Sequence, residues 1–140
     1  MCDQATQRLC LTIHNNLHEG DITLKNLISL SGQPYEKGKS LRLLSTEDVE
    51  NIRIQPGESK SIGFCGSATL ALGIEGMLDL HFGDESRITS LYWNGPKDRL
   101  DNQFHVSSTD HEHFTVTASI PPDEGVLGDV SVDVRSSLES

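Results

Sequence analysis

Apolar residues in this chain recur at every second position rather than at every third or fourth. Near the start, Leu9, Leu11 and Ile13 alternate with polar or small neighbours. Alternation of this kind gives a β-strand one apolar face, so the pattern predicts a strand at residues 8–14. Residues 22–30 continue the alternation in the same way. We expect one face of that second strand to carry Ile22, Leu24, Asn26, Ile28 and Leu30.

Six further segments have the length and the flanking turn residues of strands. They are residues 59–64, 76–82, 87–93, 103–107, 114–120 and 129–135. A spacing of roughly ten residues between short strands is typical of an all-β sandwich. Only residues 45–50 compete for a helix, because Ser45 can cap a short acidic turn. We therefore predict a single all-β domain over residues 1–140, an antiparallel β-sandwich with little or no helix. Flexible ends are expected at residues 1–7 and 136–140.

The charge balance narrows the set of partners. The chain has 140 residues, and 21 Asp and Glu against 11 Lys and Arg give a formal net charge of -10. No basic run offsets this charge locally, so nucleic acid is excluded as a partner and anionic bilayers should repel the chain. The N-terminus lacks a basic segment followed by a long apolar one, and no apolar run reaches the ~20 residues of a membrane-spanning helix. This predicts a protein made soluble without a signal peptide.

The sequence contains no recognisable catalytic motif. It lacks a nucleophile elbow and a glycine-rich phosphate loop, so we predict no catalytic residue and no cofactor. The three cysteines, Cys2, Cys10 and Cys65, form no CxxC pair and are odd in number. This favours thiols over a disulfide framework, with Cys65 as a small buried hydrophobic residue.

Two histidines separated by one residue give the main hint of a metal site. If they belong to a strand, His111 and His113 lie on one face, as two ligands of a zinc site can. A third ligand is needed, and the candidates His81 and His105 have no spacing that supports them. We favour a solvated polar turn that leads into the next strand, so metal binding is the weaker alternative.

Aromatic residues make up only 5% of the chain, yet Tyr92 and Trp93 are adjacent at the end of a predicted strand. Neighbouring strand residues point to opposite faces, so at most one of the two rings can lie in the core. The turn that follows places Asn94 and Lys97 close to the exposed ring. Amphipathic rings favour membrane interfaces, and aromatic faces attract organic cations. This corner is the best candidate for ligand contact, and a packed corner without a ligand is the alternative.

A set of motifs within residues 9–134 resembles the aegerolysin family in order and spacing. The motifs are residues 11–15, 21–27, 55–58, 65–66, 75–80, 91–96 and 126–133. The resemblance implies a compact acidic β-sandwich without enzymatic activity. It also implies binding to membrane lipids, notably sphingolipid-containing ones, and joint action with a larger membrane-attack-complex/perforin-type partner that makes pores. Some bacterial relatives are one half of a binary insecticidal toxin.

The lipid contacts implied by the resemblance are present only in part. Tyr92 and Trp93 match the lipid-binding family members as they stand. Ser31 and Lys97 occupy the positions of two tryptophans, and Asn94 occupies that of an acid. The headgroup pocket of those members therefore does not carry over intact. The candidate lipid- or receptor-binding residues are Ser31, Tyr92, Trp93, Asn94 and Lys97.

These observations support one main functional hypothesis and one alternative. The main hypothesis is a non-enzymatic component that acts extracellularly, binds a lipid or surface receptor of a target-cell membrane, and recruits a larger perforin-like protein. Because the fungal lipid contacts are missing, we favour a binary insecticidal toxin over lysis of red cells. A homo-oligomer is compatible with this hypothesis. The alternative is a soluble carbohydrate- or protein-binding sandwich with a polar groove at Asp110, His111 and Glu112.

Overall fold

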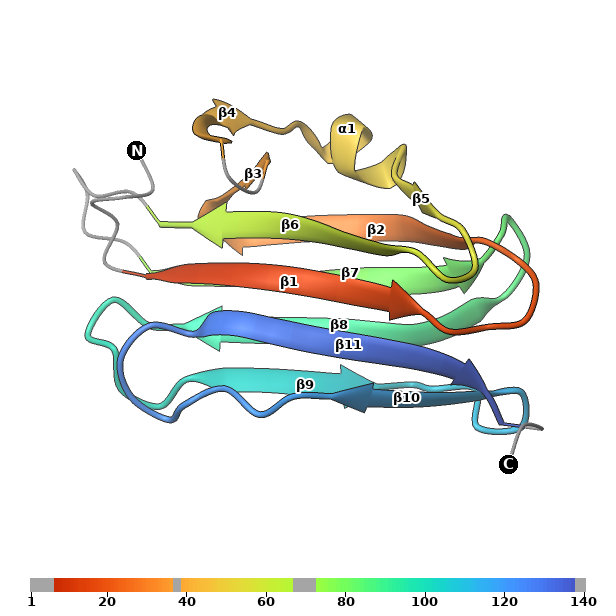
Figure 1. Ribbon diagram of the computed structural model, residues 1–140. Coiled ribbons are helices and arrows are strands. Elements are labelled where there is room, and N and C mark those ends of the chain that lie inside the picture. The colour runs from red at the N-terminus through yellow and green to blue at the C-terminus, as the bar shows by residue number, and fades with distance from the viewer. Residues whose placement is uncertain (1–6, 37–38, 67–72, 138–140) are drawn as a thin grey trace.

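The computed structural model describes residues 7–36, 39–66 and 73–137, which form two β-sheets packed face to face (Figure 1). In spatial order, the six-stranded sheet consists of β10 (Phe114–Ala118), β11 (Gly128–Ser136), β1 (Arg8–Asn15), β6 (Ser59–Cys65), β3 (Gln33–Glu36) and β4 (Lys39–Leu43). The five-stranded sheet consists of β5 (Arg53–Ile54), β2 (Ile22–Ser31), β7 (Ile74–Phe82), β8 (Arg87–Gly95) and β9 (Gln103–Ser107).

This arrangement confirms the predicted fold class, a β-sandwich with one short helix. Each of the eight predicted strands is present, and their ends differ from the predicted ones by at most two residues. The helix is α1 (Thr46–Glu50), and Ser45 and Asp48 form a capping box at its start. No helix among the described residues is long and apolar enough to cross a bilayer. The prediction missed β3, β4 and β5, because such short strands carry too little alternation to be recognised.

One pair of strands departs from the predicted antiparallel pattern. β1 and β11 run in the same direction in the middle of the six-stranded sheet, with Leu11 opposite Val130 and Ile13 opposite Val132 (Figure 1). Parallel neighbours need a long connection, and here all the intervening strands supply it. Alternation along a strand shows which face is buried, but it does not show the direction of the neighbouring strand.

The core lies between the two sheets. Leu9, Leu11 and Ile13 of β1 are fully buried, as their alternation predicts. Trp93 of β8 is 1% exposed, and the centroid of its indole ring lies 4.6 Å from that of the Phe64 ring on β6. Because β6 and β8 belong to different sheets, this aromatic pair joins the two layers. It also fixes which face of β8 points outward.

A bulge in β2 changes which of its side chains reach the core. Asn26 has a positive φ of 56°, and the pairing of β2 with β7 is irregular at this point. Just beyond it, Leu27 is buried, and its amide donates to a carboxylate oxygen of Glu50 in α1 at 3.1 Å. The extra residue reverses the facing of the positions that follow. The prediction that Ile28 and Leu30 share one face with Ile22 and Leu24 is therefore wrong, since Ile22 and Leu24 are fully buried while Ile28 and Leu30 are 47% and 60% exposed.

Gln7 lies just before β1, and its buried side chain joins separate loops. Its Nε2 donates to the carbonyl oxygen of Gly125 at 2.9 Å, and its Oε1 accepts from the amide of Leu127 at 3.0 Å. Gln7 is thus fixed in place rather than part of a flexible end, and Ser136 is likewise part of β11. The outermost residues of both predicted flexible ends lie outside the described residues.

The cysteines do not all follow the sequence-based expectation. Cys65 at the end of β6 is buried, as predicted, but it is disulfide-bonded rather than a thiol. Cys10 on β1 carries a thiol, and Cys2 lies outside the described residues. An odd number of cysteines excludes complete pairing but not a single disulfide, so the count could not decide this point.

Candidate functional site

The outer face of the five-stranded sheet carries a row of apolar and aromatic side chains. Strand pairing places Ile28, Met77, Tyr92 and His105 beside one another across β2, β7, β8 and β9. We call these four residues the Tyr92 row. Paired residues on neighbouring strands lie about 5 Å apart, so the row is a continuous strip of surface. Ile28 and Met77 are exposed to solvent, at 47% and 37%.

Tyr92 makes the polar contacts of this row. Its hydroxyl donates to Oε2 of Glu75 at 2.5 Å, and its ring stacks on the imidazole of His105 with the two centroids 6.0 Å apart. The hydrogen bond to Glu75 raises the pKa of Tyr92 above its usual value of 10, because it favours the neutral phenol. Desolvation and the charge of the Glu75 carboxylate raise the pKa further. Tyr92 therefore keeps its proton and presents an amphipathic ring on this face.

A second, polar row lies next to the Tyr92 row, closer to the end of β8. Strand pairing aligns Ser31, Glu75, Asn94 and Gln103. The hydroxyl of Ser31 donates to the carbonyl oxygen of Gly73 at 2.8 Å. Gly73 packs against the turn after β8, where a Cβ atom on Gly73 would lie 2.8 Å from the amide nitrogen of Lys97. The ends of β2 and β8 and the turn that follows thus form one polar corner beside the Tyr92 row.

The structure brings together most of the predicted site residues but separates Trp93 from them. Ser31, Tyr92 and Asn94 lie on the outer face of the sheet, and Lys97 is exposed in the turn at the same end. Trp93 points into the core and is 1% exposed. The expectation that Trp93 touches a ligand is therefore corrected. Alternation permits one ring on each face of β8, and the larger, more apolar ring is the buried one.

Sequence reasoning missed four residues of this surface, namely Glu75, Ile28, Met77 and His105. Each acquires its place through strand pairing, which the linear pattern does not reveal. Ile28 was assigned to the opposite face because the bulge at Asn26 leaves no clear signal in the sequence. An asparagine within an apolar alternation was the one available hint, since Asn tolerates positive φ better than most residues.

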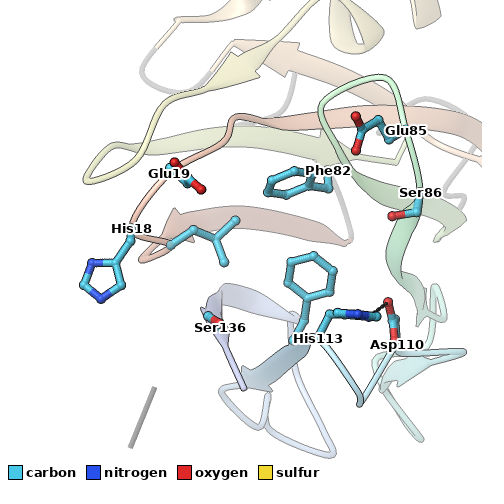
Figure 2. Close-up of a pocket in the computed structure, with 10 residues that line it drawn as sticks. His18, Glu19, Phe82, Glu85, Ser86, Asp110, His113 and Ser136 are labelled. Carbon is cyan, nitrogen blue, oxygen red and sulfur yellow. Dashed lines mark hydrogen bonds and ion pairs between the residues drawn. The ribbon is translucent and has the colours of Figure 1, made fainter. Parts of the chain in front are cut away.

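A cleft lies at the opposite end of the sandwich, beside the start of β8. Its volume is about 640 Å³, and it opens between the loop after β1, the turn between β7 and β8, and the loop before β10 (Figure 2). Leu17, Phe82 and Phe114 give it an apolar floor. The acids among its lining residues are Glu19, Glu85 and Asp110.

The structure places the two candidate metal ligands in a turn rather than on a strand. His111 and His113 precede β10, and Nδ1 of His113 lies 2.9 Å from Oδ2 of Asp110. The idea of two imidazoles on one strand face is wrong, and the polar turn is confirmed. Within residues 7–36, 39–66 and 73–137, no group of three side chains could hold a metal ion. Of the predicted polar groove, Asp110 lines the cleft, while His111 and Glu112 do not.

Sequence comparison shows which family the chain belongs to. The profile of the Aegerolysin family matches residues 6–137. The chain belongs to the aegerolysin family. The resemblance predicted from its motifs is thereby confirmed. In this aegerolysin, the Tyr92 row and the polar corner are both built by strands that lie within the matched region.

Two relatives match this aegerolysin along most of their length. Terrelysin of Aspergillus terreus is 27% identical over 133 residues, which cover 94% of this chain and 90% of Terrelysin. Asp-hemolysin of Aspergillus fumigatus is 25% identical over 126 residues, covering 89% of this chain and 90% of that protein. Among solved structures, RahU in complex with a Tris molecule superposes with a TM-score of 0.87 at 18% identity, covering 94% of this chain and 96% of RahU. This last likeness shows a shared fold.

Proposed function

We propose that this aegerolysin is the non-enzymatic, membrane-binding component of a binary pore-forming cytolysin. It acts outside the cell that makes it, binds a lipid or surface receptor of the target cell, and recruits a larger perforin-like partner. An insecticidal toxin is the setting that we favour. The observation that carries the proposal is the exposed Tyr92 row on the outer face of the five-stranded sheet. Membership of a lysin family and a relative named as a hemolysin support it.

The Tyr92 row has the chemistry of a membrane-interface contact. Ile28 and Met77 offer apolar side chains that a bilayer interface would remove from water, at about 25 cal/mol for each Å² of apolar surface. Tyr92 combines an apolar ring with a polar hydroxyl, a combination enriched where a protein meets the headgroup region. In the adjoining corner, Ser31 and Asn94 supply hydrogen-bonding groups for a headgroup. Trp93 supports the site from the core and makes no contact itself.

The charge of the protein selects among membranes. A formal net charge of -10 opposes approach to anionic lipids, so binding through the Tyr92 row should favour zwitterionic or uncharged headgroups. Lys97 is exposed beside the corner and can contact a headgroup phosphate, but one exposed ion pair contributes little. Apolar and aromatic contact, rather than charge, therefore drives the proposed binding.

Flotation with liposomes tests this surface. Wild type should float with vesicles that contain its lipid, and Tyr92→Ala should lose at least about tenfold in affinity while remaining folded. Tyr35→Ala is the matched control, because Tyr35 is the other tyrosine of the chain and lies on β3 of the opposite sheet. Equal loss in both variants, or no flotation with any lipid, would contradict the proposal and favour a soluble carbohydrate- or protein-binding role.

A permeabilisation assay tests the division of labour with the partner. Dye-loaded vesicles or target cells are exposed to this protein alone, to a candidate perforin-like protein alone, and to both. We expect leakage from the pair only, with insect midgut cells more sensitive than red cells. Lysis by the single chain at low concentration would contradict the need for a partner. Leakage that is unchanged by Tyr92→Ala would contradict the role of the Tyr92 row.

A further inference from the structure

The cleft at the other end of the sandwich has an apolar, aromatic floor. Leu17 and Phe114 are 7% and 8% exposed, and the centroids of the Phe82 and Phe114 rings lie 5.8 Å apart. A floor of this kind favours a hydrocarbon body. Aromatic faces also attract cations, because the face of the ring carries partial negative charge. The floor therefore suits an apolar ligand and tolerates a positively charged one.

The rim of the cleft carries the acids Glu19 and Glu85, which no lysine or arginine among the lining residues neutralises. Glu19 lies on one side of Phe82 and Glu85 on the other (Figure 2). In the part of the chain that the structure describes, the side chains of Glu19 and Glu85 have no hydrogen-bond or ion-pair partner. Asp110 pairs with His113. The lining includes the imidazoles of His18 and His113 but no lysine or arginine, so Glu19 and Glu85 attract a bound cation without a lysine or arginine to oppose them.

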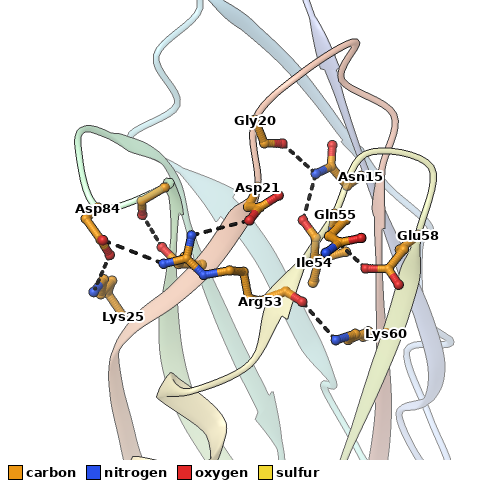
Figure 3. A network of polar contacts seen from close by, with 12 residues as sticks. Asn15, Gly20, Asp21, Lys25, Arg53, Ile54, Gln55, Glu58, Lys60 and Asp84 are labelled. Atoms are coloured by element: carbon orange, nitrogen blue, oxygen red, sulfur yellow. Dashed lines mark hydrogen bonds and ion pairs between the residues drawn. The ribbon is translucent and has the colours of Figure 1, made fainter.

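Ion pairs fix the turn that bears Glu85. Arg53 of β5 pairs with Asp21 at 3.3 Å and with Asp84 at 3.6 Å, and Lys25 of β2 pairs with Asp84 at 3.4 Å (Figure 3). Asp84 lies in the turn between β7 and β8, directly before Glu85. Exposed ion pairs are individually weak, but together they hold this turn against β2 and β5. One wall of the cleft is thus held in place before any ligand arrives.

A buried asparagine fixes the opposite wall. Asn15 donates from Nδ2 to the carbonyl oxygens of Gly20 and Ile54 at 3.0 and 2.9 Å (Figure 3). Its Oδ1 accepts from the amide of Leu17 at 3.0 Å. Gly20 lies so close to the floor that a Cβ there would sit 2.3 Å from the ring of Phe82. The loop that carries Glu19 is therefore packed against the floor, and the cleft is a preformed feature.

We propose that this cleft binds a small organic cation, an ammonium group on a compact apolar body. The body rests on the rings of Phe82 and Phe114, and the ammonium group lies between Glu19 and Glu85. A volume of about 640 Å³ lies within the usual range for small-molecule sites. This site is separate from the Tyr92 row and does not depend on the proposed membrane function.

Three probes of similar size distinguish charge recognition from simple apolar binding. They are benzyltrimethylammonium, benzyl alcohol and phenylacetate, whose charges are positive, zero and negative. In NMR titrations of the full chain we expect shifts at the amides of Leu17 and Phe114, with none at Tyr92. The cation should bind at least about tenfold more tightly than the other two probes, and its affinity should fall as salt is raised. Equal binding of all three probes, or no binding of the cation, would overturn the proposal.

Charge-removing variants test the rim. Glu19→Gln and Glu85→Gln should each weaken binding of benzyltrimethylammonium about two- to fivefold, as expected for partly exposed charge pairs, and the double variant should lose about tenfold. Glu124→Gln is the control, since it removes the same charge at the other end of the sandwich. These exposed substitutions should leave the thermal midpoint unchanged. Unchanged affinity in the double variant, or an equal loss in Glu124→Gln, would overturn the proposed site.

Discussion

The outer faces of the two sheets differ although their inner faces are alike. On the six-stranded sheet, the outward residues of β1 are Cys10, Thr12 and His14, and the last two are paired with serines and an aspartate on the neighbouring strands. The hydroxyl oxygens of Thr12 and Ser61 lie 2.7 Å apart, and Nδ1 of His14 is hydrogen-bonded to the hydroxyl of Ser59 at 2.5 Å. On the five-stranded sheet, the corresponding outer positions include the apolar Ile28 and Met77 beside Tyr92.

This difference is not needed for folding, because both sheets already bury their inner faces in one shared core. A row of apolar side chains left in water gains free energy when a second surface covers it. The six-stranded sheet shows that this fold can solvate an outer face with hydroxyl groups. We infer that the Tyr92 row is exposed for contact with a second surface rather than for stability.

The two faces of β8 should differ strongly in how much their side chains contribute to the free energy of unfolding. Trp93→Ala should lower the free energy of unfolding by about 3–5 kcal/mol, because it empties a core position packed on Phe64. Tyr92→Ala, one residue away, should change that free energy by less than about 1 kcal/mol. Denaturant unfolding followed by circular dichroism measures both values. If both variants lose a similar free energy of unfolding, Tyr92 has a structural role, and the two faces of β8 do not differ as proposed.

The outer faces of the two sheets should differ in how much they contribute to liposome affinity. Ile28→Ser combined with Met77→Ser should reduce liposome affinity at least about tenfold, because both changes remove exposed apolar surface from the Tyr92 row. Thr12→Ala combined with Ser131→Ala, a pair on the outer face of the six-stranded sheet, should leave affinity unchanged. Flotation and vesicle co-sedimentation report both results. A larger loss from the six-stranded sheet would reverse the assignment of the binding face.

A smaller effect concerns the proton of Tyr92. The hydrogen bond to Glu75 raises the folded-state pKa of Tyr92 above 10, so its contribution to stability is fully present below pH 10 and is lost as pH rises through the folded pKa. Ultraviolet titration should show a tyrosine that ionises late in wild type and is missing in Tyr92→Phe. Glu75→Gln should move this pKa back toward 10. If Glu75→Gln leaves the titration of Tyr92 unchanged, Glu75 does not set the pKa of Tyr92.

The smallest effect concerns Lys97. Lys97→Gln should change liposome affinity by about twofold, since a single exposed cation contributes little in salt solution. The measurement is flotation at low and at physiological ionic strength. A loss of tenfold or more, or strong binding of wild type to phosphatidylserine vesicles, would show that charge rather than apolar contact drives binding.

The sequence predicted the fold well where burial alternates without interruption. The strand with Leu9, Leu11 and Ile13 is an example, because each apolar side chain reaches the core directly. It failed at Asn26, where one extra residue turns Ile28 outward, and at the β1–β11 pair, whose direction depends on residues far apart in the chain. Alternation shows that a strand has two faces, but strand pairing decides what those faces meet.

The candidate site was predictable only in part for the same reason. Tyr92 and Asn94 belong to one local motif, so composition and spacing could point to them. Glu75 and His105 become neighbours of Tyr92 through pairing across β7, β8 and β9. Alternation alone does not say which of the two adjacent rings, Tyr92 or Trp93, is buried. The packing of Trp93 against the opposite sheet decides the matter.

Photo-crosslinking with a lipid that carries a light-activated group in its headgroup region shows which outer face of the sandwich touches the membrane. The wild-type chain is bound to vesicles, irradiated, digested and mapped by mass spectrometry. We predict adducts at Ile28, Met77 and Tyr92, with Tyr92→Ala lowering the total yield. Adducts concentrated at Thr12 and Ser61 would show that the outer face of the six-stranded sheet, and not the Tyr92 row, meets the membrane.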